Sequence, residues 1–198
     1  MSTTVAAYQL VETDEGVRGR HTRIPLEDLG EGDVLIRVPH SSVNYKDGLA
    51  ATGRAPIARR LPLVGGCCAA GTVVEPGKSG VRADTVVAVV GATLSEQHNG
   101  GYCEYLRVPA AWVVAVPEAF TSRQAAAIGT AGVTSAMAVV KLEDAGVTPE
   151  SGPIAVTGAS GGAGSLAVAL LAARGYEVTA LTGKPEAEDL LRDLGAAN

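Results

Sequence analysis

Aromatic residues and cysteines are scarce in this sequence of 198 residues. Aromatic side chains make up 4% of it, and the three cysteines are Cys67, Cys68 and Cys103. An odd number of cysteines, two of them adjacent, does not predict a disulfide framework, so we expect reduced thiols. The formal net charge is −5, from 16 Lys and Arg against 21 Asp and Glu. This balance argues against a surface for nucleic acid.

Long hydrophobic runs are also missing. No uninterrupted apolar run approaches the roughly 20 residues that cross a bilayer, and the first residues lack the basic and then apolar pattern of a secretion signal. We therefore expect a cytoplasmic protein whose partners include neither a membrane nor a nucleic acid. Hydrophobic residues make up 46% of the chain, which is typical of a folded globular protein with one large core or two modest domains.

Residues 1–120 predict a β-rich domain. Short runs rich in β-branched residues alternate there with Gly, Pro or Asp at the turns. We expect strands at residues 5–11, 33–39, 71–76, 85–90, 105–109 and 112–117. Many short strands separated by turns indicate a compact barrel or sandwich.

Residues 121–198 predict a different architecture. Thr121 and Gln124 have the spacing of a capping box and begin an Ala-rich helical stretch, which a second helix over 133–142 follows. After it we expect a buried strand at 154–157, a helix at 163–174, a strand at 177–181 and a helix at 185–194. This order is typical of the first half of a doubly wound α/β domain.

A glycine-rich loop, TGASGGAGS at residues 157–165, lies between the predicted strand and helix of that unit. Such a loop permits a tight turn, brings the backbone close to a pyrophosphate, and presents the N–H groups and dipole of a helix N-terminus. We predict a nucleotide site there, with a purely structural turn as the alternative. The residues predicted to hold the nucleotide are Gly158, Ser160, Gly161, Gly162, Ala163 and Gly164.

The tip of the second strand bears on the choice of nucleotide. Sites for NAD usually carry an acidic residue there for the ribose hydroxyls, whereas this chain has Thr182 and Lys184. A hydroxyl and an ammonium suit a 2′-phosphate, which a carboxylate would repel. We predict NADPH rather than NADH as the cofactor, with a solvated loop lysine as the alternative reading of Lys184.

Four segments carry a resemblance to a known family: SVNYKD at 42–47, IGTAGVTS at 128–135, LEDAGV at 142–147 and VTGASGG at 156–162. With them the chain resembles the amino-terminal part of the zinc-free medium-chain dehydrogenases/reductases, in the branch of acrylyl-CoA reductases and quinone oxidoreductases. The resemblance implies an α/β fold in which a β-rich GroES-like catalytic domain precedes a Rossmann-type domain. It also implies NADPH-dependent reduction of an activated carbon–carbon double bond in a small enoyl thioester, or of a quinone.

The same resemblance implies roles for individual residues. Asn44 would donate its amide to a developing oxyanion or to the nicotinamide ribose, and the Tyr45 hydroxyl would orient substrate or relay a proton, unless it is merely a packed aromatic. Thr134 would lie against the cofactor. Zinc-dependent relatives carry a cysteine ligand where residues 44–45 stand, and the histidines here are scattered, so we expect no metal. We expect Lys46 and Asp47 to form a local pair.

Two features depart from the family pattern. Residues 65–71 read GGCCAAG where relatives carry a Pro-Gly-X-Asp-like run, so we expect a looser turn and an altered polar contact. In addition, the α/β part of the chain has room for two strands, whereas a full doubly wound domain has about six. We therefore expect weak or no activity from this chain alone, and a non-catalytic NADPH-binding module remains an alternative. Assembly into a homo-oligomer stays open.

Overall fold

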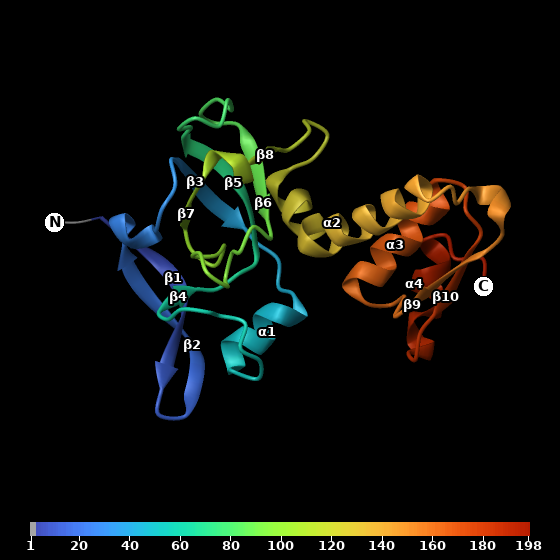
Figure 1. The fold of residues 1–198 in the computed structure, drawn as a ribbon, viewed down its shortest axis with the longest axis horizontal. Helices are drawn as coiled ribbons and strands as arrows, with labels where there is room; N and C mark the ends of the chain where they lie inside the picture. The colour runs from blue at the N-terminus through green and yellow to red at the C-terminus, as the bar shows by residue number, and fades with distance from the viewer. Residues whose placement is uncertain (1–2) are drawn as a thin grey trace. The chain divides into compact units, whose positions relative to one another are not determined.

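The structure is a computed structural model that describes residues 3–198 (Figure 1). The chain divides into two compact units, the first ending at Thr130 and the second running from Ala131 to Asn198. The division expected from the sequence lies earlier, after residue 120, where the β-rich pattern ends. Each unit has its own core and is described by itself.

The larger sheet of the first unit has five strands in the order β7-β3-β5-β6-β8, with antiparallel neighbours. It buries a core of Val, Ile and Leu side chains that includes Ile36, Val73 and Leu106. The sequence pattern predicted all five strands to within a few residues at each end. They are β3 (Val34–His40), β5 (Cys68–Glu75), β6 (Val86–Val90), β7 (Tyr105–Val108) and β8 (Val114–Ala115).

A smaller sheet has the order β2-β1-β4. β1 (Thr4–Thr13) was predicted, whereas β2 (Gly16–Pro25) and β4 (Leu63–Val64) were not. β2 reads GVRGRHTRIP. Its sequence lacks the alternation of apolar and polar residues that marks a half-buried strand, and only Ile24 in it is buried. It forms because β1 provides a continuous antiparallel partner, with Val5 opposite Ile24. This hairpin is drawn in blue in Figure 1.

Short helical turns complete the first unit. The 3-10 helices η1 (Leu26–Leu29) and η2 (Ala110–Trp112) connect strands. Helix α1 (Tyr45–Thr52) contacts β2 and ends at Gly53, whose φ of 66° is left-handed.

Helix α2 (Ser122–Asp144) begins in the first unit and continues into the second. The side chain of Gln124 accepts from the Thr121 backbone N–H at 2.9 Å, as the predicted capping box requires. Gly129 has φ 41° and ψ −147° and divides α2 into two helical segments. By length and composition alone α2 could span a membrane. Because Val139 in its second half belongs to a buried core, this is weak evidence, and the absence of a membrane partner stays a prediction.

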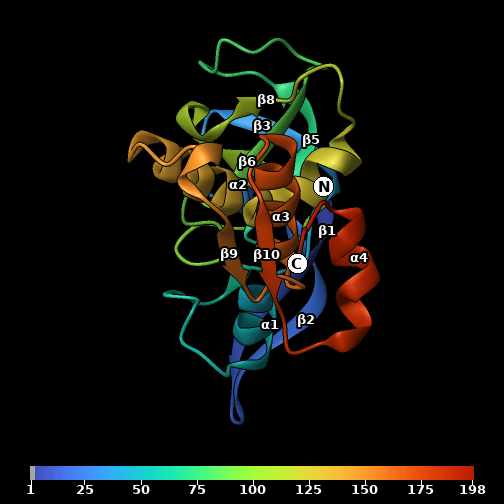
Figure 2. The same ribbon diagram turned by 90° about the vertical axis from the view of Figure 1, so that its right-hand side faces the viewer.

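The second unit pairs two parallel strands, β9 (Ile154–Thr157) and β10 (Val178–Leu181), which lie side by side in Figure 2. The unit also contains α3 (Gly162–Ala173), α4 (Glu188–Asp193), η3 (Pro149–Ser151) and η4 (Pro185–Ala187). Its core includes Val168, Leu171 and Val178. The expectation that β9 is buried is wrong, because alternate residues of β9 are exposed.

The outer edge of β10 is partly hydrogen-bonded by the last residues of the chain. Ala197 donates its backbone N–H to the Val178 carbonyl at 2.8 Å, and Ala180 donates to the Asn198 carbonyl at 2.7 Å. This edge of β10 therefore has partners for some of its backbone groups.

Candidate nucleotide and substrate sites

The glycine loop folds as the sequence predicts. The backbone N–H of Gly161 donates to the Gly158 carbonyl at 2.9 Å, and Ala159 donates to the Leu181 carbonyl at 3.1 Å, which fastens the loop to the end of β10. Helix α3 then begins at Gly162 with no acidic residue in its first turn. The N–H groups of that turn have no intrahelical acceptor, so this end of α3 suits an anion.

At Gly164 the fold leaves no room for a side chain. A Cβ at this position would lie 2.2 Å from the Gly158 carbonyl oxygen and 2.8 Å from the Ala159 Cα. The first turn of α3 therefore rests directly on the loop backbone. The buried Ser135 hydroxyl holds the same turn from outside by donating to the Ala163 carbonyl at 2.7 Å.

The tip of β10 carries the polar groups that the sequence predicted. The hydroxyl oxygens of Ser160 and Thr182 lie 2.8 Å apart, and the Lys184 backbone N–H donates to Thr182 Oγ1 at 3.1 Å. This ties Ser160 in the glycine loop to Thr182 and to the segment that follows β10. The result is a hydroxyl pair beside the loop with a lysine next to it.

A hollow of about 220 Å³ adjoins this tip and adds a cation that the sequence analysis missed. Thr182, Lys184 and Arg192 all line it. Arg192 comes from α4 and also pairs with Glu188 at 3.0 Å, so its charge is partly offset. Its i to i+4 spacing from Glu188 indicated only an exposed ion pair, and nothing in the sequence placed it beside the strand tip.

Thr134 lies in the second half of α2 and lines another hollow of the second unit, of about 300 Å³. Ala163 and Gly164 of the first turn of α3 line the same hollow. The structure thus brings Thr134 close to the residues of the glycine loop. The sequence pattern had given no indication of this proximity beyond the family resemblance.

Asn44 and Asp47 are hydrogen-bonded to each other in the first unit. The Asn44 backbone N–H donates to Asp47 Oδ2 at 2.9 Å, and its side-chain amide nitrogen lies 3.2 Å from the same oxygen, 3.4 Å from Ser42 Oγ and 3.3 Å from Cys67 Sγ. The amide N–H groups of Asn44 therefore already have acceptors within the chain. Asn44 begins α1, and this arrangement fixes the start of that helix.

Lys46 and Asp47 do not pair with each other, so that expectation is wrong. Lys46 forms an ion pair with Glu96, and the buried Asp47 accepts the Cys67 backbone N–H at 3.0 Å. Adjacent residues on a helix point in different directions, so the two side chains reach different partners. In contrast, the Tyr45 side chain is 86% exposed.

The two adjacent thiols are buried and free. Cys67 Sγ lies 3.4 Å from Thr130 Oγ1, and Cys68 Sγ lies 2.9 Å from Ser42 Oγ. The hydrogen bond with Cys68, burial and the Asp47 carboxylate raise the pKa of the Cys67 thiol, whereas hydrogen bonds from Cys67 and Ser42 lower the pKa of Cys68. If the pair loses a proton, Cys68 is therefore the thiolate.

The turn that carries these thiols is hydrogen-bonded to a neighbouring segment, and its loosening relative to the family stays a prediction. The Gly101 backbone donates to the Gly66 carbonyl at 2.9 Å, and the Tyr102 backbone donates to Gly65 at 2.9 Å. The Tyr102 hydroxyl in turn donates to the Ser42 carbonyl at 3.0 Å. Burial and the nearby Asp47 raise the pKa of the Tyr102 hydroxyl. Sequence analysis missed Tyr102, whose partners lie far from it in the chain.

Within residues 3–198, no three His, Cys, Asp or Glu side chains gather in a way that could hold a metal ion. His98 is buried and its ring nitrogens lie 3.0 Å and 2.8 Å from the carbonyls of Asn99 and Glu31. His40 Nδ1 lies 3.0 Å from Ser122 Oγ. Independence from zinc stays a prediction.

Comparison with known proteins gives close matches over nearly the whole chain. Residues 30–118 match the alcohol dehydrogenase GroES-like domain. The acrylyl-CoA reductase AcuI of Ruegeria pomeroyi is 46% identical over 174 residues, which are 88% of this chain and 53% of that protein. The YhfP protein of Bacillus subtilis, which is named as a quinone oxidoreductase, is 42% identical over 197 residues, and the match covers 60% of it.

Solved structures agree with these relatives. The yhdH oxidoreductase from Salmonella enterica in complex with NADP superimposes with a TM-score of 0.93 at 42% identity, covering 97% of this chain and 59% of that one. Bacillus subtilis yhfP with NAD bound gives a TM-score of 0.93 at 41% identity, covering 99% and 60%. This chain thus spans little more than half the length of these relatives. Over nearly its whole length the chain is similar in sequence and fold to the amino-terminal part of medium-chain dehydrogenases/reductases, with a GroES-like domain followed by the first part of a Rossmann-type domain.

Proposed function

We propose that this protein binds NADPH and reduces the activated carbon–carbon double bond of a small enoyl thioester of the acrylyl-CoA kind. The observation that carries the proposal is the loop and strand tip of the second unit, where Gly164, the Ser160–Thr182 hydroxyl pair and Lys184 lie together. The names of the matched relatives support the reductase assignment, and one of them was solved with NADP.

The residues present fit a dinucleotide phosphate. The contact between Gly164 and the loop backbone leaves no side chain over the start of α3, and the first turn of α3 carries no acidic residue. In our proposal the loop N–H groups hold the pyrophosphate, and Thr182 and Lys184 hold the 2′-phosphate, with Arg192 as a further cation. When bound, NADPH supplies the hydride for the reduction.

Asn44 and Tyr45 take different parts in this proposal. Because the Asn44 amide is engaged by Asp47, Ser42 and Cys67, it serves to fix the start of α1 and thereby the place of Tyr45. The exposed Tyr45 hydroxyl is the group that meets substrate and orients it or relays a proton. Thr134 contacts the cofactor from α2. We also propose that the protein is cytoplasmic and works without zinc.

The first test is nucleotide binding to the purified chain by calorimetry. We expect saturable binding of NADPH and a dissociation constant for NADH that is at least about tenfold higher. NADH lacks the 2′-phosphate and therefore cannot form the charge-assisted contacts that this phosphate makes. Absence of heat with either nucleotide would overturn the oxidoreductase assignment.

The second test separates the candidate substrates by following NADPH oxidation. From this chain alone we expect at most slow oxidation with acrylyl-CoA, because it spans little more than half the length of its relatives. Tyr45→Phe should decrease that rate by about tenfold or more with unchanged NADPH affinity. Oxidation with tetramethyl-1,4-benzoquinone alone would favour a quinone oxidoreductase, the function that the name of YhfP indicates. Binding of NADPH without turnover of any substrate would instead indicate a non-catalytic module or a chain that is inactive by itself.

A further inference from the structure

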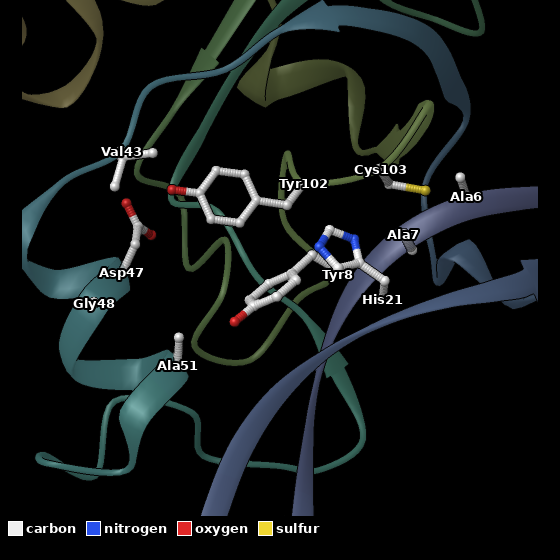
Figure 3. Close-up of a pocket in the computed structure, with 10 residues that line it drawn as sticks. All are labelled: Ala6, Ala7, Tyr8, His21, Val43, Asp47, Gly48, Ala51, Tyr102 and Cys103. Carbon is white, nitrogen blue, oxygen red and sulfur yellow. The ribbon is translucent and has the colours of Figure 1, made fainter.

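We propose that the first unit carries a second small-molecule site, which takes an uncharged planar ring bearing oxygen acceptors. A cavity of about 580 Å³ lies in this unit between helix α1 and the β1–β2 hairpin (Figure 3). Its volume falls within the range of sites that bind drug-sized molecules. All of its lining residues belong to the first unit, so the site does not depend on the nucleotide-binding unit.

Aromatic rings form one side of the cavity. Tyr8 in β1 and His21 in β2 are cross-strand partners, and their ring centroids lie 5.2 Å apart in an edge-on arrangement. Tyr102 stands edge-on to Tyr8 with centroids 6.3 Å apart. Figure 3 shows the Tyr8 and His21 rings together beside the hairpin, and the Tyr102 ring with its hydroxyl directed toward Val43 and Asp47. Ring edges and faces of this kind favour a flat aromatic guest over a flexible chain.

The remaining walls are small and apolar. Ala6 and Ala7 come from β1, Val43 lies just before α1, and Ala51 lies in α1. Gly48 of the same helix also lines the cavity and has open space where a Cβ would stand. Small residues opposite a wall of rings leave a slot into which a ring can slide.

The charges of the lining exclude an anion. No Lys or Arg lines the cavity, and its one carboxylate, Asp47, already accepts the backbone N–H groups of Asn44 and Cys67. A phosphate or carboxylate would lose part of its hydration there beside a like charge and without a cation, which is costly. A cation gains little either, because both oxygens of Asp47 already accept backbone N–H groups. We therefore propose a neutral guest.

Two polar groups are available to orient the guest. Within residues 3–198, neither the Tyr8 hydroxyl nor the His21 ring takes part in a hydrogen bond with another residue. Both can donate, and they lie on the same wall of an otherwise apolar slot. A ring with one or two carbonyl or hydroxyl oxygens at its rim would satisfy them.

The experiment is a titration of the 198-residue chain with 4-hydroxyacetophenone, followed by NMR or calorimetry at neutral pH. We expect saturable binding, and binding at least about tenfold weaker for 4-hydroxybenzoate, which has the same ring with a carboxylate. Gly48→Leu should fill the slot and weaken binding by about tenfold or more. Tyr8→Phe, which removes one hydroxyl, should weaken it by about fivefold.

The variants keep the test interpretable. Leu is favoured over Gly inside a helix, so Gly48→Leu should unfold at a urea concentration no lower than the parent does. Val114→Thr, at an exposed position of β8 outside the cavity, should bind like the parent. The proposal is overturned if nothing binds saturably, if a folded Gly48→Leu binds as well as the parent, or if 4-hydroxybenzoate binds as tightly. None of these outcomes depends on whether the second unit binds NADPH.

Discussion

The Asp47 carboxylate accepts the backbone N–H of Cys67 at 3.0 Å and so joins helix α1 to the segment that leads into β5. Its other oxygen accepts the Asn44 backbone N–H. Asp47 is 5% exposed; its bond with Cys67 is buried and its bond with Asn44 is partly buried. One buried side chain therefore fixes the position of Asn44, which precedes Tyr45, and of Cys67, the first of the two adjacent thiols.

We predict that Asp47→Ala lowers the free energy of unfolding by about 2–4 kcal/mol, because it leaves one buried and one partly buried backbone N–H group without acceptors. Urea denaturation would measure this. Asp47→Asn keeps one carbonyl acceptor and should cost less than Asp47→Ala. Equal stability of the parent and Asp47→Ala would mean that water replaces the carboxylate and that these bonds do not organise the site.

Much of the second unit could be predicted from the sequence because its signals are local. The loop at 157–165, the strand before it and the helix after it follow each other directly in the chain, and the structure places them within a few residues of the prediction. Ser160 and Thr182 come together because parallel strands bring their carboxyl ends to one edge of the sheet.

The first unit was less predictable where partners are distant in sequence. Asp47 and Cys67 are 20 residues apart in the chain, so a local pair with Lys46 was the available interpretation, and it was wrong. Tyr102 was missed for the same reason, since its hydroxyl donates to Ser42. β2 was missed because its residues are polar on both faces and its pairing with β1 determines its conformation.

A prediction concerns Lys184. Lys184→Ala should raise the dissociation constant of NADPH by about three- to tenfold and leave that of NADH nearly unchanged, since only NADPH carries the 2′-phosphate. Calorimetry with both nucleotides would check this. Lys141→Ala on α2 removes the same charge from outside the hollow at the β10 tip and serves as the control. Equal weakening of both nucleotides by Lys184→Ala would contradict the assignment of this residue to the phosphate.

Gly164 and Gly162 offer a matched pair of substitutions in one helical turn. A Cβ at Gly164 would lie 2.2 Å from the Gly158 carbonyl, whereas one at Gly162 would lie 3.5 Å from the Ala131 Cβ, an ordinary contact. We expect Gly164→Ala to lower the free energy of unfolding by about 1–3 kcal/mol and to abolish measurable NADPH binding.

Gly162→Ala should keep its stability, because Ala is favoured over Gly in a helix, and should lose affinity only if the phosphate approaches that backbone. Thermal unfolding and NADPH titration of the two variants would separate these effects. If both variants were equally stable, the loop could move away from α3, and the close contact at Gly164 would not be essential.

The final prediction concerns stability at alkaline pH. Burial raises the pKa of the Cys103 thiol and of the Tyr102 hydroxyl. A group whose pKa is higher in the folded state binds its proton more tightly there, so the stability it contributes is complete below its unfolded pKa and is lost as pH rises above it. The ordinary thiol pKa here is 9.0. The free energy of unfolding should therefore fall above about pH 9, by up to about 1.4 kcal/mol per pH unit for each such group.

Cys103→Ala removes one of these groups and should make the fall in stability less steep, whereas the slope of stability against pH near neutrality should not change. Urea denaturation at a series of pH values would measure both slopes, and an unchanged alkaline slope in Cys103→Ala would show that this thiol does not titrate more easily on unfolding.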